Sequence, residues 1–437
     1  MARFDILVVG AGIMGVASAY HLKKSSPSKT VLLVDRYGSP GQGNTGRSNA
    51  MFRNTFSSSD NQVLSNCSID FYIGSQSEGS DLGLQQIGYL WLMTQEGMSR
   101  SERFVAMMER NGIAVKRYSR EELKARLPGM AAGFKEDADA ALMGLGSVDG
   151  GLFGPKCGRL DPDKLVRFYM AKFTKLGGEV AFNTDVERLN FAPSTRLGID
   201  GEPLVWQEAG IDGVQASGTI KGEIRAKTVV LACGAWGNEL LEPAGFDGHV
   251  KAKKRQLFSI AAKGSDRLMG LLHTRGFNTL DLLPMVILPK SGVHFKPVSE
   301  ENEFWVACED DLNRPYIDIP DHDLENYKAE ESYFANGIHP VLRSYFPDFA
   351  GSRPRSMWAG LYSYNTLDFL PFAFREGDLI VVGGDSGSGI MKGDSLGRIA
   401  DALYRDEEDA MLYGDVPYRA SKISFEHRDV EREEWVL

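Results

Sequence analysis

The chain has 437 residues, of which 43% are hydrophobic and 25% are charged, and its formal net charge at pH 7 is −10. This length suggests two or three domains, and the negative charge argues against binding of nucleic acid or anionic lipid. Four widely spaced cysteines without a CxxC pair argue against a metal site or a disulfide framework. No stretch approaches the roughly 18 apolar residues of a membrane span. We therefore expect an intracellular, cytoplasmic protein without a metal, and attachment at the membrane periphery stays open.

The chain begins with a strand–turn–helix–strand pattern typical of a dinucleotide-binding fold. Residues 6–9 are an apolar run of the kind that a strand inside a parallel sheet requires. In the motif that follows, Gly10 suits the tight turn, Gly12 the approach of a pyrophosphate, and Gly15 close helix packing. A second apolar run ends at Asp35, whose carboxylate can bind the ribose hydroxyls of an adenosine. The motif does not separate NAD from FAD, but Asp35 argues against NADP.

Further elements can be placed along the chain. Residues 85–97 predict a strand closed by a turn, and residues 99–112 predict an amphipathic helix. A capping box begins at Ser119, and Asp161 followed by proline marks the start of another helix. Residues 229–241 repeat the order strand, glycine, helix.

The second half of the chain first predicts antiparallel sheet. Alternating, strand-like runs occur at residues 255–262, 292–299 and 303–310. An acidic helix-and-loop stretch covers residues 318–337, and residues 377–404 return to strand, glycine loop and helix. Parallel α/β segments therefore lie at the start, middle and end of the chain, with antiparallel sheet between them.

This order predicts an α/β protein with a discontinuous Rossmann-type FAD-binding domain. We assign residues 1–86, 148–236 and 360–437 to that domain. An inserted, mostly antiparallel α+β substrate domain takes residues 87–147 and 237–359. An NAD dehydrogenase would normally keep its nucleotide fold in one block, so the arrangement favours FAD.

Five motifs in this order resemble the D-amino-acid oxidase/sarcosine oxidase family of flavoproteins. The resemblance covers essentially the whole chain. It rests on VVGAGIMG with Asp35, GRSNAMFR, VVLACGAW, WAGLYSYNTLDFLP and IVVGGDSGSGIMKGDSLG. The family implies a tightly held FAD that removes two electrons from the C–N bond of an amine and leaves an imine.

Three further stretches are similar to archaeal dye-linked L-proline dehydrogenases. They are FRNTFSSSDNQVLSN with DLGLQQIGYLWL, LGIDGEPLVWQEA, and the terminal GSGIMKGDSLGR. This narrower resemblance implies L-proline as the substrate.

The resemblance also explains why the chain needs a second glycine loop, at residues 383–389. In the family this loop and the helix after it lie under the isoalloxazine ring. Backbone N–H groups and the positive end of the helix dipole then favour the reduced flavin. Gly387 and Gly389 would let the backbone come that close.

Two cations match the family's substrate-binding pair. Lys392 stands where sarcosine-oxidase-type members carry a lysine for the substrate carboxylate, and Arg53 matches its usual arginine partner. Arginine can bind a carboxylate bidentately, while lysine adds a point charge. The plain alternatives are a solvated helix residue for Lys392 and a surface ion pair for Arg53.

Aromatic side chains are the third group of expected site residues. Tyr362, Trp358 and Tyr364 would wall an apolar pocket for a pyrrolidine ring, as would Tyr89, although aromatic residues are more often plain core. The seven histidines show no ligand spacing and receive no role. The expected catalytic residues are Arg53, Lys392 and Tyr362. The expected cofactor-binding residues are Gly10, Gly12, Ile13, Met14, Gly15, Asp35, Arg36, Arg47, Ser48, Ala50, Met51, Val186, Ala232, Gly234, Trp236, Gly360, Gly387, Ser388, Gly389, Ile390, Met391 and Lys392.

The chain departs from the family at two positions. Some sarcosine oxidases attach FAD through a cysteine, but residues 358–368 contain none, so we expect non-covalent FAD. Oxygen-using members place a second lysine over the flavin, but residues 303–310 contain none. Lys296 is the nearest candidate and is expected on a neighbouring strand. The missing lysine favours a dehydrogenase that passes electrons to a quinone or an artificial dye.

Alternatives to an L-proline dehydrogenase stay open. They are an oxidase or dehydrogenase of an N-methyl or D-amino acid such as sarcosine, a flavoprotein subunit of a larger complex, and, remotely, a redox-inactive NAD-binding protein. The chain is a possible homo-oligomer. The charged run Arg428–Glu434 and the terminal residues Trp435–Leu437 would form a disordered tail. Alternatively, Trp435–Leu437 would cover the substrate pocket or dock on a neighbouring subunit.

Overall fold

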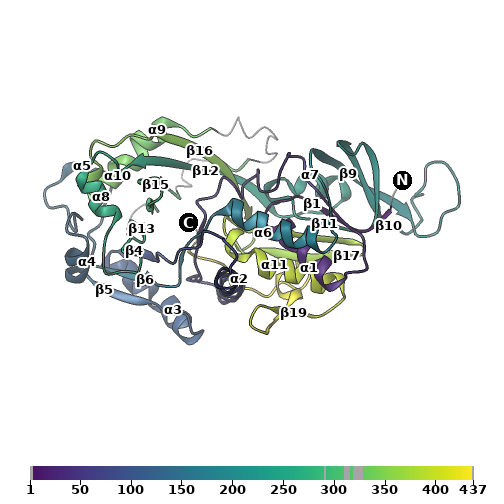
Figure 1. Cartoon of the computed structure of the whole chain (residues 1–437), viewed down its shortest axis with the longest axis horizontal. Helices are drawn as coiled ribbons and strands as arrows, with labels where there is room; N and C mark the ends of the chain where they lie inside the picture. The colour runs from purple at the N-terminus through teal and green to yellow at the C-terminus, as the bar shows by residue number, and fades with distance from the viewer. Residues whose placement is uncertain (1–2, 290–291, 310–314, 318–327, 436–437) are drawn as a thin grey trace.

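The computed structural model describes residues 3–289, 292–309, 315–317 and 328–435. The molecule is elongated, and its two sheets lie toward opposite ends (Figure 1). The part drawn on the right contains the N-terminal strand and, from late in the sequence, helix α11 (Gly393–Tyr404), whereas the end of the chain is marked left of the middle.

The first sheet has eight strands and is built around parallel β1. Its order is β17-β18-β11-β1-β2-β8, and β10 and β9 extend it from β11 as an antiparallel hairpin. The pairs β2–β8, β1–β2, β1–β11 and β11–β18 are parallel, and β17–β18 is antiparallel. The strands are β1 (Arg3–Val9), β2 (Val31–Val34), β8 (Glu179–Ala181), β9 (Thr184–Pro193), β10 (Ala209–Gly218), β11 (Gly222–Leu231), β17 (Phe372–Glu376) and β18 (Leu379–Gly383).

Alternation along β1 divides the core of this part. Ile6 and Val8 pack with α1 (Ile13–Ser25), α2 (Ser59–Ser77), α6 (Pro162–Lys175) and α11 on one face. Leu7 and Val9 pack on the other face with residues of β9, β10 and α7 (Asn238–Leu241). The continuous apolar run of residues 6–9 therefore is buried on both faces, as predicted.

The second sheet is mostly antiparallel. Its order is β16-β12-β15-β14-β13-β4-β6-β5, and only the β13–β4 pairing among its described strands is parallel. The strands are β4 (Tyr89–Met93), β5 (Lys116–Ser119), β6 (Gly150–Gly154), β12 (Val250–Ala261), β13 (Met285–Ile287), β14 (His294–Val298), β15 (Glu303–Ala307) and β16 (Ser356–Asn365). Its helices are α3 (Gln95–Arg110), α4 (Arg120–Arg126), α5 (Ala138–Leu142), α8 (Asp266–Leu272), α9 (Glu331–Tyr333) and α10 (His339–Tyr345).

The predicted fold class is confirmed: an α/β part built on a largely parallel sheet is combined with a mostly antiparallel sheet. The second sheet includes β6 and all of β16, so it extends into two ranges that the sequence assigned to the FAD-binding domain. The predicted capping box at Ser119 and the Asp161 cap with Pro162 at the first position of α6 are both present. Most of the acidic stretch predicted at residues 318–337 lies outside the described residues.

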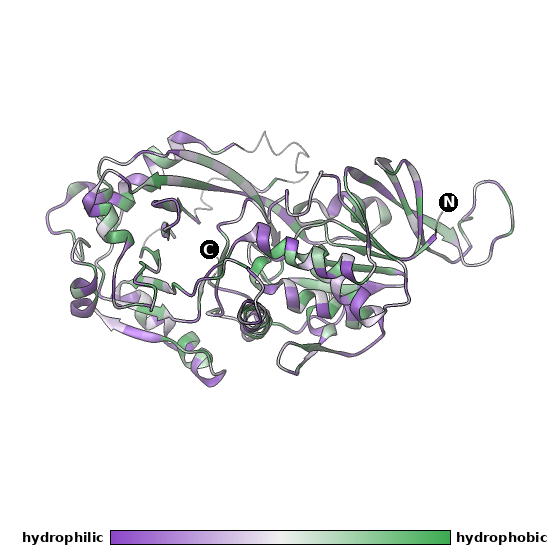
Figure 2. Cartoon of the chain, in the orientation of Figure 1, coloured by the Kyte–Doolittle hydropathy of each residue, from purple (hydrophilic) through white to green (hydrophobic). Residues whose placement is uncertain are grey.

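Hydropathy follows this architecture. Hydrophobic residues concentrate on the central strands, and hydrophilic residues predominate on outer elements such as α4 (Figure 2). Within the described ranges no helix is long and apolar enough to cross a bilayer.

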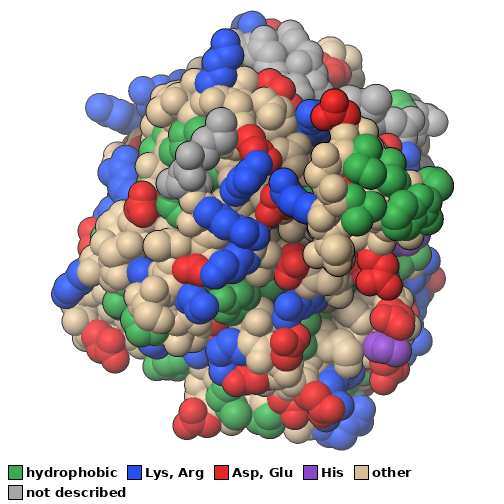
Figure 3. Space-filling model, turned by 90° about the vertical axis from the view of Figure 1, so that its right-hand side faces the viewer, with side chains coloured by type: hydrophobic (Ala, Val, Ile, Leu, Met, Phe, Trp, Pro, Cys, Tyr) green, Lys and Arg blue, Asp and Glu red, His purple; other side chains and the backbone are tan. Residues whose placement is uncertain are grey.

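The loop between β9 and β10 is an exception on the surface. It extends from one end of the molecule (Figure 1), and Leu197, Ile199, Val205 and Trp206 are between 48% and 103% exposed. Figure 3, which views the molecule from this end, shows a hydrophobic cluster among charged side chains. Exposed apolar clusters often mark contact surfaces. A homo-oligomer, which stays a prediction, is best sought at this loop.

Candidate active site

The first glycine loop lies at the carboxyl ends of the parallel strands. Gly10 has φ +99°, and a Cβ on it would lie 2.6 Å from the Ala232 carbonyl oxygen. A Cβ on Gly15 would overlap the Gly10 carbonyl oxygen, so Gly15 serves close packing of α1 against the turn. Only glycine fits these two positions.

Asp35 is fixed beside this loop at the end of β2. Its carboxylate accepts hydrogen bonds from the backbone N–H groups of Ala11 at 2.6 Å and Tyr37 at 2.8 Å. Burial raises the pKa of Asp35, and those two hydrogen bonds oppose the rise. The acid therefore faces the turn at the point where the nucleotide fold binds a ribose.

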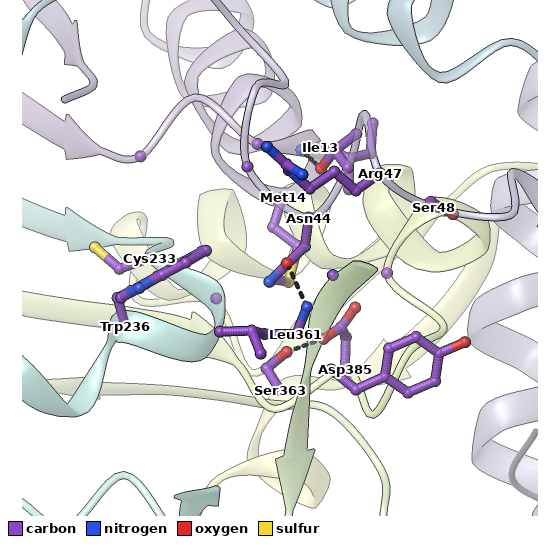
Figure 4. Close-up of a pocket in the computed structure, with 18 of the residues that line it drawn as sticks. Ile13, Met14, Asn44, Arg47, Ser48, Cys233, Trp236, Leu361, Ser363 and Asp385 are labelled. Carbon is purple, nitrogen blue, oxygen red and sulfur yellow. Dashed lines mark hydrogen bonds between the residues drawn. The ribbon is translucent and has the colours of Figure 1, made fainter. Parts of the chain in front are cut away.

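A large cavity begins at this loop and encloses about 1430 Å³, its open mouth included (Figure 4). Its wall combines residues from the start, middle and end of the chain. Asn44, for example, accepts a hydrogen bond from the Leu361 N–H at 2.8 Å (Figure 4). The predicted cofactor residues in the wall are Gly10, Gly12, Ile13, Met14, Asp35, Arg36, Arg47, Ser48, Val186, Ala232, Gly234, Trp236, Gly360, Gly387, Gly389 and Ile390.

The other expected cofactor residues lie elsewhere. Met51, Ser388 and Met391 line a smaller neighbouring cavity, while Gly15, Ala50 and Lys392 line neither cavity. The sequence reasoning also missed part of the wall of the large cavity. The missed residues include Asn44, Thr45, Asn49, Asp185, Cys233, Arg255, His294, Ser363 and Asp385.

The large cavity fits FAD by its own chemistry. Its wall contains both Asp35 and the glycines Gly387 and Gly389 of the second loop. The Nε atom of Arg47 is buried without a hydrogen-bond partner among the described residues, which leaves a donor for an anionic group such as a phosphate. A Cβ on Gly387 (φ +81°) would overlap the Tyr362 ring, so the loop backbone approaches the cavity closely. Within the described ranges, no group of acidic, histidine or cysteine side chains could hold a metal ion.

Comparisons with known proteins also indicate FAD as the cofactor. The profile of the FAD dependent oxidoreductase family DAO matches residues 5–403. The chain belongs to this family. It therefore is an FAD-dependent oxidoreductase, as the resemblance predicted.

Individual relatives are distant. FAD-dependent oxidoreductase domain-containing protein 1 of Xenopus laevis is 24% identical over 420 residues, which cover 92% of this chain and 79% of the relative. Peroxisomal sarcosine oxidase of Mus musculus is 26% identical over 245 residues, which cover 56% of this chain and 54% of the relative.

Solved structures of amino-acid oxidoreductases share the fold. L-Proline dehydrogenase from P. horikoshii has a TM-score of 0.72 at 21% identity, covering 92% of this chain and 94% of that structure. Glycine oxidase from Geobacillus kaustophilus has a TM-score of 0.69 at 19% identity, covering 93% and 96%. These likenesses show that the chain shares its fold with enzymes that act on amino acids.

The smaller cavity adjoins the large one and encloses about 570 Å³. Ser48, Asn49, His294, Tyr362 and Gly387 line both cavities. The rest of the wall of the smaller cavity combines six apolar or aromatic residues with polar and charged ones. The apolar or aromatic residues are Met51, Phe56, Tyr89, Met285, Phe369 and Met391, and the polar or charged ones are Arg53, Asn61, Ser386, Ser388 and Glu433. This wall is the candidate substrate site.

Arg53 is the cation in the wall of the smaller cavity. Its side chain is buried, and its Nη1 donates to the Thr55 carbonyl oxygen at 3.1 Å. Its Nη2 donates to the carbonyl oxygen of Trp435, near the end of the chain. The guanidinium lies 4.2 Å from the centre of the Phe56 ring. Three of its five N–H donors remain for a ligand.

Lys392 lies behind the wall instead of in it. It is fully buried, and its Nζ donates to the Ser388 Oγ at 2.5 Å and lies 4.8 Å from the Phe56 ring centre. Burial lowers the pKa of Lys392 to about 7; the carboxylates of Glu433 and Asp385 oppose this shift, and Arg53 adds to it. Because Ser388 lines the smaller cavity, Lys392 reaches that cavity through Ser388.

The expected aromatic residues divide into two groups. Tyr362 and Tyr89 line the smaller cavity, whereas Trp358 and Tyr364 line neither cavity. Trp358 donates from Nε1 to the Arg47 carbonyl oxygen at 3.1 Å, and Tyr364 accepts from Arg255 at 2.5 Å. Trp358 therefore supports the loop that carries Arg47.

Lys296 lies on β14 next to β15, as expected. Its register partner across this pair is Trp305. Its Nζ donates to the Asn49 carbonyl oxygen and lies 4.3 Å from the centre of the Trp305 ring. Burial lowers its pKa well below the ordinary value for lysine. Lys296 thus holds the loop that carries Asn49.

The C-terminal segment is packed, so the prediction of a disordered tail is wrong for residues 428–435. Arg428 pairs with both carboxylate oxygens of Asp368, at 2.5 and 2.7 Å. Glu433 lines the smaller cavity, and its carboxylate accepts four hydrogen bonds from Ser57, Ser58 and Asn61, at 2.7 to 3.1 Å. The carboxylate therefore also stabilises the positive N-terminal end of α2.

Trp435 packs beside the candidate substrate site. Its ring centre lies 5.8 Å from that of Trp91 and 5.4 Å from that of Phe104. Val436 and Leu437 lie outside the described residues. Whether the end of the chain acts as a cover stays a prediction.

We expect acid precipitation of the purified yellow protein to release all of its flavin as free FAD. The reason is the absence of cysteine from residues 358–368, where some relatives form the covalent link. The measurement is the flavin absorbance of supernatant and pellet. Flavin that stays in the pellet would show a covalent bond.

Proposed function

We propose that the chain is an FAD-dependent L-proline dehydrogenase, which oxidises the C–N bond of proline to an imine. The observation that carries this proposal is the composition of the smaller cavity. Arg53 supplies a buried cation for the carboxylate, and the apolar and aromatic side chains among the mixed lining suit a pyrrolidine ring. The cavity opens on the large cavity through shared residues, so a substrate there would lie beside the cofactor.

The comparisons support an amino-acid substrate. Structures with the same fold include L-proline dehydrogenase and glycine oxidase, and curated relatives include sarcosine oxidases. The substrates in these names share an amine next to a carboxylate. N-Methyl and D-amino acids stay the alternative, because they carry the same two groups, and a role as a flavoprotein subunit of a larger complex stays open.

FAD, when bound, supplies the acceptor for the two electrons. Gly10, Gly12, Asp35 and Arg47 would hold its nucleotide and phosphates, and the loop at Gly387 and Gly389 would hold the ring system. In the smaller cavity, Arg53 binds the substrate carboxylate and fixes the substrate's orientation. The C-terminal segment, through Glu433 and Trp435, excludes water from this side of the cavity.

The proposed electron acceptor is a quinone or an artificial dye. Residues 303–309, which include β15, carry no lysine, and the ammonium of Lys296 is held by the Asn49 carbonyl. A cation placed to stabilise superoxide is therefore lacking on that strand. Peroxide formation at the rate of dye reduction would contradict this part of the proposal and would point to Lys296.

We expect L-proline to bleach the flavin absorbance of the holoenzyme under anaerobic conditions. Sarcosine and D-amino acids should bleach it much more slowly at equal concentration, because the apolar and aromatic side chains of the smaller cavity favour a ring. The measurement is the visible spectrum after mixing each compound with oxygen-free enzyme. Faster bleaching by sarcosine or a D-amino acid would replace proline as the proposed substrate.

A further inference from the structure

His294 occupies the junction of the two cavities, although no sequence pattern singled it out. It lines both cavities and is buried. Its Nδ1 lies 2.8 Å from the Gly292 carbonyl oxygen. A carbonyl can only accept, so Nδ1 carries the proton. Nε2 is therefore the acceptor atom of the neutral ring, and no described residue donates a hydrogen bond to it.

The ring stays neutral at physiological pH. Burial lowers the pKa of His294 to about 4; the Gly292 hydrogen bond opposes this shift, and the positive charges of Arg255, Arg53 and Lys296 add to it. A neutral imidazole with a fixed tautomer can accept a hydrogen bond but is a poor proton acceptor.

Asn49 presents a second acceptor in the same place. It lines both cavities, and its Oδ1 is buried without a hydrogen-bond partner within the described ranges. Buried acceptors of this kind normally have a donor. The loop is not free to turn away, because Lys296 donates to the Asn49 carbonyl oxygen. His294 and Lys296 stand two residues apart on β14, and so on one face of the strand.

We propose that His294 Nε2 and Asn49 Oδ1 form an amine-recognition pair, which accepts hydrogen bonds from the N–H groups of the substrate amine. This proposal rests on the proposed function, because it assumes that the substrate is an amino acid. Arg53 then holds the carboxylate in the smaller cavity, while the pair holds the nitrogen at the opening toward the large cavity. Two acceptors match the two N–H groups of a protonated secondary amine. An analogue with oxygen in place of N–H leaves both acceptors unpaired, which the site should disfavour.

The test compares L-proline with L-tetrahydro-2-furoate on the holoenzyme. The second compound keeps the five-membered ring and the carboxylate but has an ether oxygen in place of the N–H. The dissociation constant for proline comes from the concentration dependence of anaerobic flavin reduction. The dissociation constant for the furoate comes from perturbation of the oxidised flavin spectrum, a measurement that needs no turnover. The variants are His294→Ala, His294→Gln and Asn49→Ala, with exposed His273→Ala as the matched control.

We expect His294→Ala and Asn49→Ala each to raise the dissociation constant for proline about tenfold, which corresponds to ~1.4 kcal/mol. The constant for the furoate should stay within twofold or fall. His294→Gln should recover part of the proline affinity, because its amide oxygen can accept. Equal weakening of both compounds, or unchanged proline binding in both variants, overturns the proposal. If His294→Ala loses FAD or unfolds, the dissociation constants of Asn49→Ala and His294→Gln for the two compounds test the proposal instead.

Failure of the proposed function gives a different result. In that case the wild-type flavin is not reduced by proline at all. The recognition pair is then tested with the amine that does reduce it and the matching oxygen compound, for instance sarcosine and methoxyacetate, and the same two outcomes apply.

Discussion

Replacement of Arg53 by alanine should lower kcat/KM for L-proline by roughly 30-fold to several thousand-fold while FAD stays bound. The range follows from the roughly 2–5 kcal/mol that is lost when one partner of a desolvated charge pair is removed. Arg53 is buried and lines the smaller cavity but not the large one, so the loss should fall on substrate binding. Steady-state kinetics and the flavin content of the purified variant measure the two effects.

Two further variants make this result specific. Arg100→Ala removes an arginine that is 74% exposed and paired with Glu96 on the surface of α3, so it should change neither quantity. Lys392→Met should change kcat or the flavin potential more than KM, because Lys392 contacts Ser388 behind the cavity wall. A near-normal KM in Arg53→Ala would remove Arg53 from the substrate site.

Deletion of residues 435–437 should raise KM for the amino acid about tenfold or lower kcat while FAD content stays nearly unchanged. Thermal stability should fall moderately, because the Trp435 ring loses its packing on Trp91 and Phe104. The Trp435 carbonyl accepts a hydrogen bond from Arg53, so loss of this segment frees the guanidinium and opens the cavity to water. Glu433, which binds the N-terminal end of α2, is kept in this variant. The measurements are steady-state kinetics, flavin content and thermal unfolding.

Glu434→Ala is the matched control for the deletion, because Glu434 pairs with Arg103 at the surface and both side chains are at least half exposed. It should leave kinetics unchanged. Unchanged kinetics after the deletion would rule out a cover. An altered oligomeric state would indicate instead that the end of the chain docks on a neighbouring subunit.

The sequence could predict the fold class and most of the cofactor cavity. Glycine at positions 10 and 15 is required by local backbone geometry, and Asp35 follows its strand at a fixed spacing. The capping box at Ser119 and the cap of α6 also depend on residues within one helical turn. Such features are short-range, so a single sequence contains them.

The sequence alone predicted the extent of the second sheet less well. β6 pairs with β4 and β5, and β16 pairs along its full length with β12, which lies about a hundred residues earlier. Strand pairing over such separations depends on hydrophobic burial and register across the sheet, and neither appears in the pattern of one strand.

The sequence by itself determined the two glycine loops, the position of the acid proposed to bind a ribose, and the membership of an FAD-dependent family, because these follow from spacing within continuous segments. Only the tertiary structure decided where the charged side chains act. A buried hydrogen bond to Ser388 holds Lys392 behind the cavity wall. Arg53 is held by a hydrogen bond to the carbonyl oxygen of Trp435, 382 positions away. His294 gave no signal in the sequence, because an isolated histidine has no spacing to recognise. Its place between the cavities arises from the packing of β14 against a loop near the start of the chain, and packing of distant segments is a property of the folded chain alone.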